Sequence, residues 1–245
     1  LLRAEGIATL AHAAAGDTRF SLTVMEEVSG EHYRFVLPGP LQSAQEEQVM
    51  LTAIGAAIAE DGIRHVVASG TLPPGVSPDF YAQVARTVAA SGARLILDTS
   101  GEGLAASLSG RPYCIRINHH EAGELLGLKG PADVAAAERL TRNLVNDGST
   151  SIAIVTVAEA GAFVASAEDG CFQIHPPRVS VVSTVGAGDS FVGALALGLS
   201  RDWPLESAVR YGVAAAASAV TTEATRLCRR EDTERLFGSL EVDRA

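Results

Sequence analysis

Lysine is almost absent from this sequence. Lys129 is the single lysine among 19 basic residues, so arginines carry nearly all the positive charge, and 29 acidic residues give a formal net charge of −10. A negative overall field opposes binding to nucleic acid, so no nucleic-acid partner is expected. An anionic substrate would need a local site built from backbone N–H groups and from arginines, whose planar fork suits phosphate and carboxylate.

Cysteines and long apolar runs are also scarce. Cys114, Cys171 and Cys228 lie far apart and without neighbouring metal ligands, which is typical of reduced thiols in a cytoplasm. Every apolar stretch falls short of the ~20 residues that a membrane helix needs. These absences predict a cytoplasmic protein that does not enter a membrane.

Strand-like and helix-like segments alternate along the chain. Two partly alternating runs within residues 19–37 predict a β-hairpin around a turn at 29–31. Further strands are expected at 64–70, 93–101, 112–118 and 149–157, helices at 77–92, 119–127, 131–148 and from about 187, and a second hairpin at 161–177. This alternation favours a single α/β domain over residues 1–245, with a mostly parallel sheet covered on both faces and ligands at the carboxyl ends of its strands.

The stretch STVGAGDS at residues 183–190 precedes an apolar helix. Gly186 and Gly188 let the backbone turn tightly and let an anion approach, and the free N–H groups of the helix point into the same space. Neither a Walker A nor a G-x-G-x-x-G pattern is present. A carboxylate at Asp189 would repel a phosphate unless it takes the proton from an attacking hydroxyl, which predicts a phosphoryl-transfer base. The alternative is an aspartate favoured by the helix dipole, and the motif alone leaves both open.

The surroundings of this motif resemble the PfkB (ribokinase-like) carbohydrate kinases. Four stretches agree with that family in order and spacing, namely SGTLPPGV at 69–76, LDTSGEGL at 97–104, INHHEAGELLG at 117–127 and CFQIHPPRVSVVSTVGAGD at 171–189. The resemblance covers nearly the whole chain and implies a ribokinase-like three-layer α/β/α fold with a small β lid at about 19–37. Residues 18–40 and 224–237 are most similar to the PfkB-type 6-phosphofructokinases.

The resemblance also implies an activity. Ser183 stands where many sugar and nucleoside kinases of the family have aspartate, as in the branch that acts on phosphorylated sugars. The implied reaction is ATP-dependent phosphorylation of a sugar phosphate, with fructose 6-phosphate giving fructose 1,6-bisphosphate. 1-Phosphofructokinase and tagatose-6-phosphate kinase share much of these motifs, and a catalytically silent sugar-phosphate or nucleotide sensor is the alternative from another class. The implied cofactors are ATP and Mg²⁺, with K⁺ as a further candidate.

Site residues follow from the same resemblance. The catalytic set is Asp189 as base, with Gly186, Ala187 and Gly188 forming the anion hole. The sugar-phosphate set is Arg19, Ser69 and Gly70, and the nucleotide set is Arg116, Asn118, Thr156, Ala158 and Gly161. Glu121 is implied to hold Mg²⁺ through water, and Ser183, Val185, Ala219 and Arg226 to line a monovalent-cation loop.

Some of these residues have other interpretations that the sequence leaves open. Arg19 could be a solvent-facing hairpin residue, and Ser69 with Gly70 a turn that ends a strand. Asn118 and Glu121, spaced i and i+3, also fit an N-cap and its capping-box partner, and this is compatible with ligand binding. His119 and His120 are expected to be solvated.

The sequence departs from the family in four places. Arg116 replaces a lysine, Ala158 replaces a glycine, and Thr222 with Ala224 replace an asparagine and a glycine of the monovalent-cation loop. The family's N-terminal aspartate and Gly-Gly motif, which contact the sugar, do not occur in the sequence. We therefore expect an upstream segment, without which residues 1–245 would be poorly soluble and inactive.

The hairpin at 19–37 carries apolar residues in alternation on both strands. They are Phe20, Leu22, Val24, Tyr33, Phe35 and Leu37. A two-stranded sheet cannot bury such a face by itself. Relatives of this type pair their lids between subunits, so the resemblance implies a homodimer through this hairpin.

Overall fold

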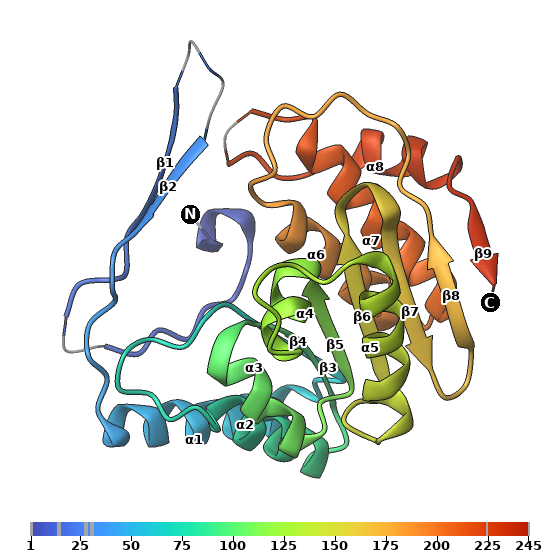
Figure 1. The fold of residues 1–245 in the computed structure, drawn as a ribbon. Helices are drawn as coiled ribbons and strands as arrows, with labels where there is room; N and C mark the ends of the chain where they lie inside the picture. Colours follow the sequence, from blue (N-terminus) through green and yellow to red (C-terminus); the bar gives the residue numbers. More distant parts are fainter. Residues whose placement is uncertain (1, 14–15, 27–28, 30–31, 224, 245) are drawn as a thin grey trace.

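The computed structural model describes residues 2–13, 16–26, 29, 32–223 and 225–244. It contains a seven-stranded sheet and a separate two-stranded ribbon (Figure 1). The ribbon consists of β1 (Ser21–Met25) and β2 (His32–Val36). The sheet consists, in spatial order, of β3 (His65–Ser69), β4 (Arg94–Asp98), β5 (Cys114–Asn118), β6 (Ile152–Val157), β7 (Gly161–Ser166), β8 (Gly170–Ile174) and β9 (Val242–Arg244).

The sheet is mostly parallel, as the sequence predicts. β3, β4, β5 and β6 pair in parallel, and β7, β8 and β9 each pair antiparallel to the strand before them. β8 therefore runs in the same direction as the four parallel strands. The carboxyl ends of β3 to β6 consequently meet at one edge of the sheet, where ligands bind in open α/β folds.

Helices cover both faces of the sheet. Their bounds are α1 (Ala44–Asp61), α2 (Phe80–Ala90), α3 (Gly101–Ser107), α4 (His119–Leu125), α5 (Val134–Asn146), α6 (Ala187–Ser200), α7 (Leu205–Val220) and α8 (Arg230–Phe237). Side chains of a strand alternate between the faces. Ile96 and Ile154 accordingly pack with α6 and α7, whereas Leu97 packs with α1 and α2, and Val155 with α4 and α5. This confirms the three-layer α/β/α arrangement.

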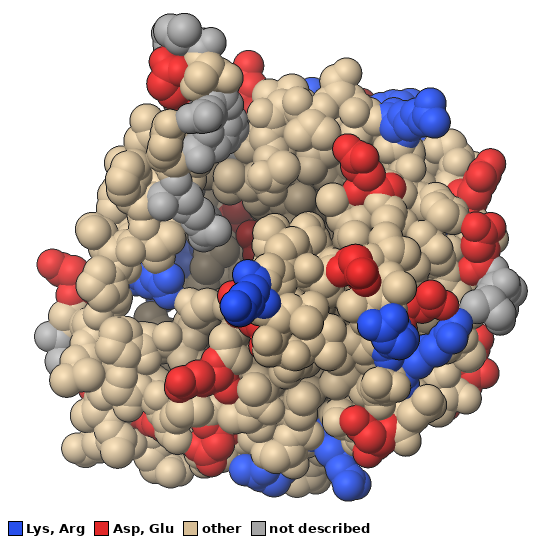
Figure 2. Space-filling view, viewed as in Figure 1, with Lys and Arg blue, Asp and Glu red and all other residues tan. Residues whose placement is uncertain are grey.

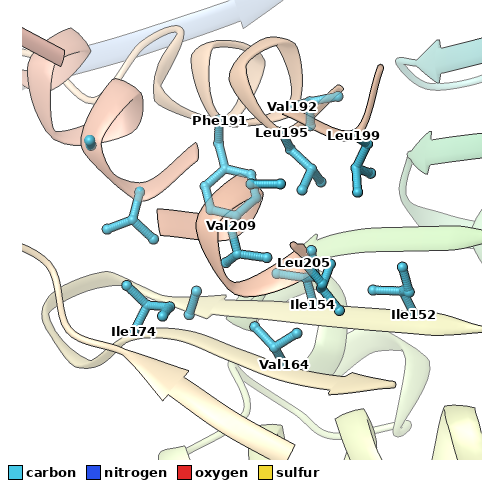
Figure 3. Packing of buried hydrophobic residues seen from close by; sticks show 14 of the residues in the cluster. Ile152, Ile154, Val164, Ile174, Phe191, Val192, Leu195, Leu199, Leu205 and Val209 are labelled. Carbon is cyan, nitrogen blue, oxygen red and sulfur yellow. The ribbon is translucent and has the colours of Figure 1, made fainter. Parts of the chain in front are cut away.

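Phe191 fixes the first turn of α6 on the sheet. Its side chain is 1% exposed and lies in the cluster with Ile154 and Ile174 shown in Figure 3. Burying an aromatic side chain of this size stabilises the fold by about 1.5–3 kcal/mol. Because Asp189 lies two residues before Phe191, this packing also fixes the backbone that carries the predicted base.

The helices and strands predicted from the sequence are all present, with shorter bounds. The expected strand at 93–101 ends at Asp98, because Gly101 begins α3, which was not predicted. Helices α1, α7 and α8 and strand β9 also had no prediction. α7 is apolar around most of its circumference, since it is buried between α6 and α8, so it lacks the one-sided pattern of a surface helix.

The β1–β2 ribbon stands apart from the sheet. Leu22 lies opposite Phe35, and Val24 lies opposite Tyr33, so these side chains share one face, and they are between 42% and 56% exposed. Figure 2 shows a hollow between the ribbon and the body of the molecule, with acidic and basic side chains at its walls. The predicted hairpin is confirmed, although most of its turn lies outside the described residues. No helix in the described ranges is long and apolar enough to cross a membrane.

Candidate active site

Residues from several segments meet at the carboxyl ends of β3 to β6. Asp98 ends β4, Asn118 ends β5, and Thr156 lies near the end of β6. Asn118 and Thr156 are register partners, and Ser69 at the end of β3 is the register partner of Asp98. The parallel register therefore aligns four polar side chains along one edge, next to the first turn of α6.

The glycine turn leaves backbone N–H groups without an acceptor at the start of α6, where the sequence predicts an anion hole. Gly186 is the N-cap residue, with a φ of 79° that favours glycine. No described residue accepts a hydrogen bond from the N–H group of Gly188 or of Asp189, whereas the Ala187 N–H contacts the Thr184 carbonyl at 3.4 Å. The free donors are thus those of Gly188 and Asp189, one position further along than expected. The Asp189 carboxylate is exposed beside them, as a proton acceptor for a bound substrate should be.

Arg116 reaches this turn from β5. Its Nη1 lies 3.6 Å from Asp98 Oδ1, and its Nη2 donates to Thr156 Oγ1 at 2.8 Å. A Cβ atom at residue 188 would lie 2.9 Å from Nη1, so only glycine fits there without moving the arginine. Asp98 was missed as a site residue, although LDTSGEGL matched the family, because its position beside Arg116 depends on the sheet register.

Asn118 and Glu121 form a capping box at the start of α4. Asn118 Oδ1 accepts from the N–H groups of His120 and Glu121, at 2.8 and 3.1 Å, and Glu121 Oε2 accepts from the Asn118 N–H at 2.7 Å. The capping interpretation is therefore confirmed, and it uses one of the two carboxylate oxygens of Glu121. His119 and His120 were expected to be solvated. His120 is exposed, whereas His119 is only half-exposed and its Nδ1 is buried.

Two buried carboxylates at this edge have raised pKa values. Burial raises the pKa of Asp98, against the lowering effect of Arg116, and the charge of Asp189 adds to the rise. Burial also raises the pKa of Glu121, against the Asn118 N–H and Arg116, and the charge of Asp98 adds to it. A divalent cation placed here would relieve this repulsion. Oxygen donors of this kind fit a hard cation such as Mg²⁺, which keeps most of its water ligands. Among the described residues, no cluster of three or more His, Cys, Asp or Glu side chains could hold a metal ion.

The predicted sugar-phosphate residues gather at the foot of the ribbon. Arg19 Nη1 donates to Thr71 Oγ1 at 2.6 Å, which joins the ribbon to the loop after β3. Thr71 was not predicted, because nothing in the sequence pairs it with a residue 52 positions earlier. The sequence predicts that the Gly70 N–H binds the sugar phosphate. In the structure this N–H donates to the Asp98 carbonyl at 2.9 Å, so it is not free to bind phosphate. The Ser69 hydroxyl is exposed and has no partner among the described residues.

The segment after β6 is predicted to contact the nucleotide. Ala158 has a φ of 26°, a backbone conformation that favours the glycine found in relatives. Gly161 has a φ of 89°, and a Cβ atom there would overlap the carbonyl of Ile174. Gly161 is therefore required by packing, whatever it contacts in a complex.

Thr222 lies within the predicted monovalent-cation loop. Its hydroxyl lies 2.8 Å from the Ala219 carbonyl oxygen and 2.6 Å from the Arg226 carbonyl oxygen. On the other side of the loop, Ser183 Oγ accepts from the Val185 N–H at 3.3 Å. The Thr222 hydroxyl thus contacts the carbonyl oxygens of two of the four residues predicted to line the loop. Ala224, the other departure, lies outside the described residues.

Residues 1–232 match the family described as pfkB family carbohydrate kinase. ATP-dependent 6-phosphofructokinase isozyme 2 of Escherichia coli (strain K12) is 38% identical over an alignment of 248 positions that covers 98% of this chain and 76% of that protein. The protein of the same name from Mycobacterium tuberculosis (strain ATCC 25618 / H37Rv) is 39% identical over 226 residues, which are 91% of this chain and 64% of that protein. 1-Phosphofructokinase of Bacillus subtilis (strain 168) is 30% identical over 243 residues, which cover 99% of this chain and 77% of that protein.

Solved structures agree with these matches. The crystal structure of phosphofructokinase-2 from E. coli in complex with potassium has a TM-score of 0.88 and 34% identity, covering 98% of this chain and 76% of that one. A structure of the tetrameric inhibited form of the same enzyme has a TM-score of 0.85 and 32% identity, covering 97% and 75%. These values, together with a family match over almost the whole sequence, confirm the resemblance inferred from STVGAGDS. The chain belongs to the pfkB family of carbohydrate kinases.

Proposed function

We propose that this protein transfers the γ-phosphoryl group of MgATP to fructose 6-phosphate and forms fructose 1,6-bisphosphate. The observation that carries this proposal is the exposed carboxylate of Asp189 beside the free N–H groups of Gly188 and Asp189. The relatives named 6-phosphofructokinase share 38% and 39% identity with this chain over 98% and 91% of its length. The 1-phosphofructokinases of B. subtilis and Xanthomonas campestris share 30% over 99% and 36% over 82% of its length, so identity and coverage together favour the 6-phosphate acceptor by a small margin.

Each group then has a role in the transfer. Asp189 accepts the proton of the attacking hydroxyl, and the two free N–H groups stabilise the negative charge that develops on the transferring phosphoryl group. Arg19 binds the phosphate already on the sugar through a charge-assisted hydrogen bond. Asn118, Thr156, Ala158 and Gly161 line the nucleotide side. Glu121 would hold Mg²⁺, and the bound ion would neutralise phosphate charge.

A panel of acceptors tests the choice of substrate. The full-length protein is assayed for ADP release with MgATP and fructose 6-phosphate, fructose 1-phosphate or tagatose 6-phosphate. We expect the highest kcat/KM with fructose 6-phosphate. A higher value with another sugar would reassign the substrate, and binding of ATP and sugar without ADP release would support the sensor alternative.

The ribbon is proposed to act as the lid of a single kinase domain and to pair with the ribbon of a second copy. The ribbon exposes an apolar face to solvent, and a second copy packed against that face would bury it. We expect light scattering at micromolar concentration to give at least a dimer, and Phe35→Asp to give a monomer. Leu128→Asp, at a similarly exposed apolar residue outside the ribbon, should leave the assembly unchanged. A wild-type monomer, or dimers of Phe35→Asp, would contradict the proposal.

A cytoplasmic location stays a prediction.

Potassium is expected to have little effect on this protein. The Thr222 hydroxyl already contacts the carbonyl oxygens of Ala219 and Arg226, so a cation would have to displace it. The test compares the protein in KCl and in choline chloride at equal ionic strength. The two activities should differ by less than about twofold, and the two melting temperatures by less than about 2 °C. Thr222→Ala should increase both differences, whereas Thr221→Ala, which removes the neighbouring hydroxyl bonded to Ser218, should not. A tenfold activation of the wild type by KCl would contradict this expectation.

A further inference from the structure

Asp98 and Arg116 form a buried ion pair beside the first turn of α6. Their side chains are 12% and 11% exposed, and Oδ1 lies 3.6 Å from Nη1. The two residues lie on the neighbouring strands β4 and β5, on the face of the sheet that α6 covers. A buried charge is costly unless it is paired, so each of these groups depends on the other.

The guanidinium of Arg116 contacts the residues on both sides of Asp189. Its Nη1 lies against Gly188, which precedes Asp189, and its Cζ lies 5.5 Å from the ring centroid of Phe191, which follows two residues later. Thr156 holds Nη2 at 2.8 Å, and Nε has no partner among the described residues. The arginine is therefore held by Asp98 and Thr156 on its sheet side and lies within one residue of the proposed base on its helix side.

Asp189 is the carboxylate that could compete for this arginine. It directly follows Gly188, and its charge acts on Asp98, so the three charges share one electrostatic environment. If Asp98 no longer paired with it, the buried guanidinium of Arg116 would be stabilised by another anion nearby, such as the Asp189 carboxylate. An arginine can bind both oxygens of a carboxylate. A carboxylate paired in this way is a weaker base.

We infer that Asp98 is a positioning residue that holds the Arg116 guanidinium on the sheet and away from the carboxylate of Asp189. This inference rests on the proposed function, in which Asp189 must be free to take a proton from the sugar hydroxyl. Asp98 is not expected to contact the substrate. It acts through Arg116, and Thr156 assists from the other side of the fork.

A crystal structure of Asp98→Asn tests the positioning without reference to activity. We expect the guanidinium of Arg116 to turn and lie within about 4 Å of the Asp189 carboxylate, the range of an ion pair. An arginine that stays beside the introduced amide and Thr156 would overturn the inference, even if the protein is an active kinase. If Asp98→Asn does not fold, Thr156→Val removes the other hydrogen bond of the Arg116 guanidinium and should shift the arginine in the same direction.

Kinetics of the same variants test the consequence. Asp98→Asn should lower kcat about tenfold, move the acid limb of the kcat–pH profile to lower pH, and change each KM by less than about threefold. In an Arg116→Met background, adding Asp98→Asn should cause little further loss of kcat, because the competing cation is already gone. Losses that multiply in the double variant would overturn the inference. An increase in the Mg²⁺ requirement equal to that of Glu121→Gln would also overturn it and assign Asp98 to the metal.

Discussion

Replacing Asp189 by asparagine should lower kcat by about 10²–10⁴-fold, the range expected for loss of a general base. The amide has nearly the same shape as the carboxylate, and it keeps the first turn of α6, but it cannot accept the proton of the attacking hydroxyl. Because the free N–H groups of Gly188 and Asp189 are retained, the fold and the affinity for ATP should be unchanged. Steady-state kinetics, thermal unfolding and ATP titration of the variant measure these three quantities.

Asp202 provides a matched control near the opposite end of the same helix. It is an exposed aspartate just beyond the last turn of α6, where it pairs with Arg64 at 3.0 Å. Its φ of 58° is a conformation that asparagine tolerates, so Asp202→Asn should fold normally and keep kcat within about twofold of the wild type. Turnover near the wild-type rate in Asp189→Asn would remove Asp189 from the mechanism.

Replacing Arg19 by alanine should lower kcat/KM for the sugar phosphate by roughly 10–100-fold, the effect of losing a hydrogen bond between charged groups. The loss should be in KM for the sugar phosphate, with KM for ATP changed by less than about twofold, because only the sugar side contains this contact. Thr71→Val removes the hydroxyl that accepts from Arg19 at 2.6 Å, so it should produce a smaller loss in the same parameter.

Arg142 is a suitable control for Arg19. It is an exposed arginine on α5 that pairs with Glu138, and Arg142→Ala should leave both KM values unchanged. Equal increases of the two KM values in Arg19→Ala would mean that Arg19 acts through the fold rather than by binding the sugar phosphate.

The sequence predicted those parts of the fold that depend on local pattern. The short apolar runs became β3 to β6, and the two hairpins formed where polar turns separate alternating segments. α7 could not be predicted in this way, because it is buried and lacks the polar stripe that marks a surface helix. The order of the strands also required the structure, since it depends on pairings between distant segments.

The candidate site shows the same division. The glycine turn and Asp189 form one local motif, so their arrangement at the start of α6 was predictable. The Arg19–Thr71 contact and the Asp98–Arg116 pair join residues that are distant in sequence, and only the register of the sheet brings the second pair together. Gly70 was predicted from its position in a motif, but its N–H is used by the Asp98 carbonyl, an interaction that no local pattern reveals.

Asp189 is proposed to act as the general base in phosphoryl transfer from ATP to fructose 6-phosphate. ³¹P NMR of the full-length wild type and of Asp189→Asn, each with MgATP and fructose 6-phosphate, tests it most directly. We expect the wild type to convert the ATP γ-phosphate signal into the phosphate-ester signal of fructose 1,6-bisphosphate, with an equal amount of ADP. Asp189→Asn should do so at least about 10²-fold more slowly. Inorganic phosphate in place of the bisphosphate, or equal rates for the two proteins, would contradict it.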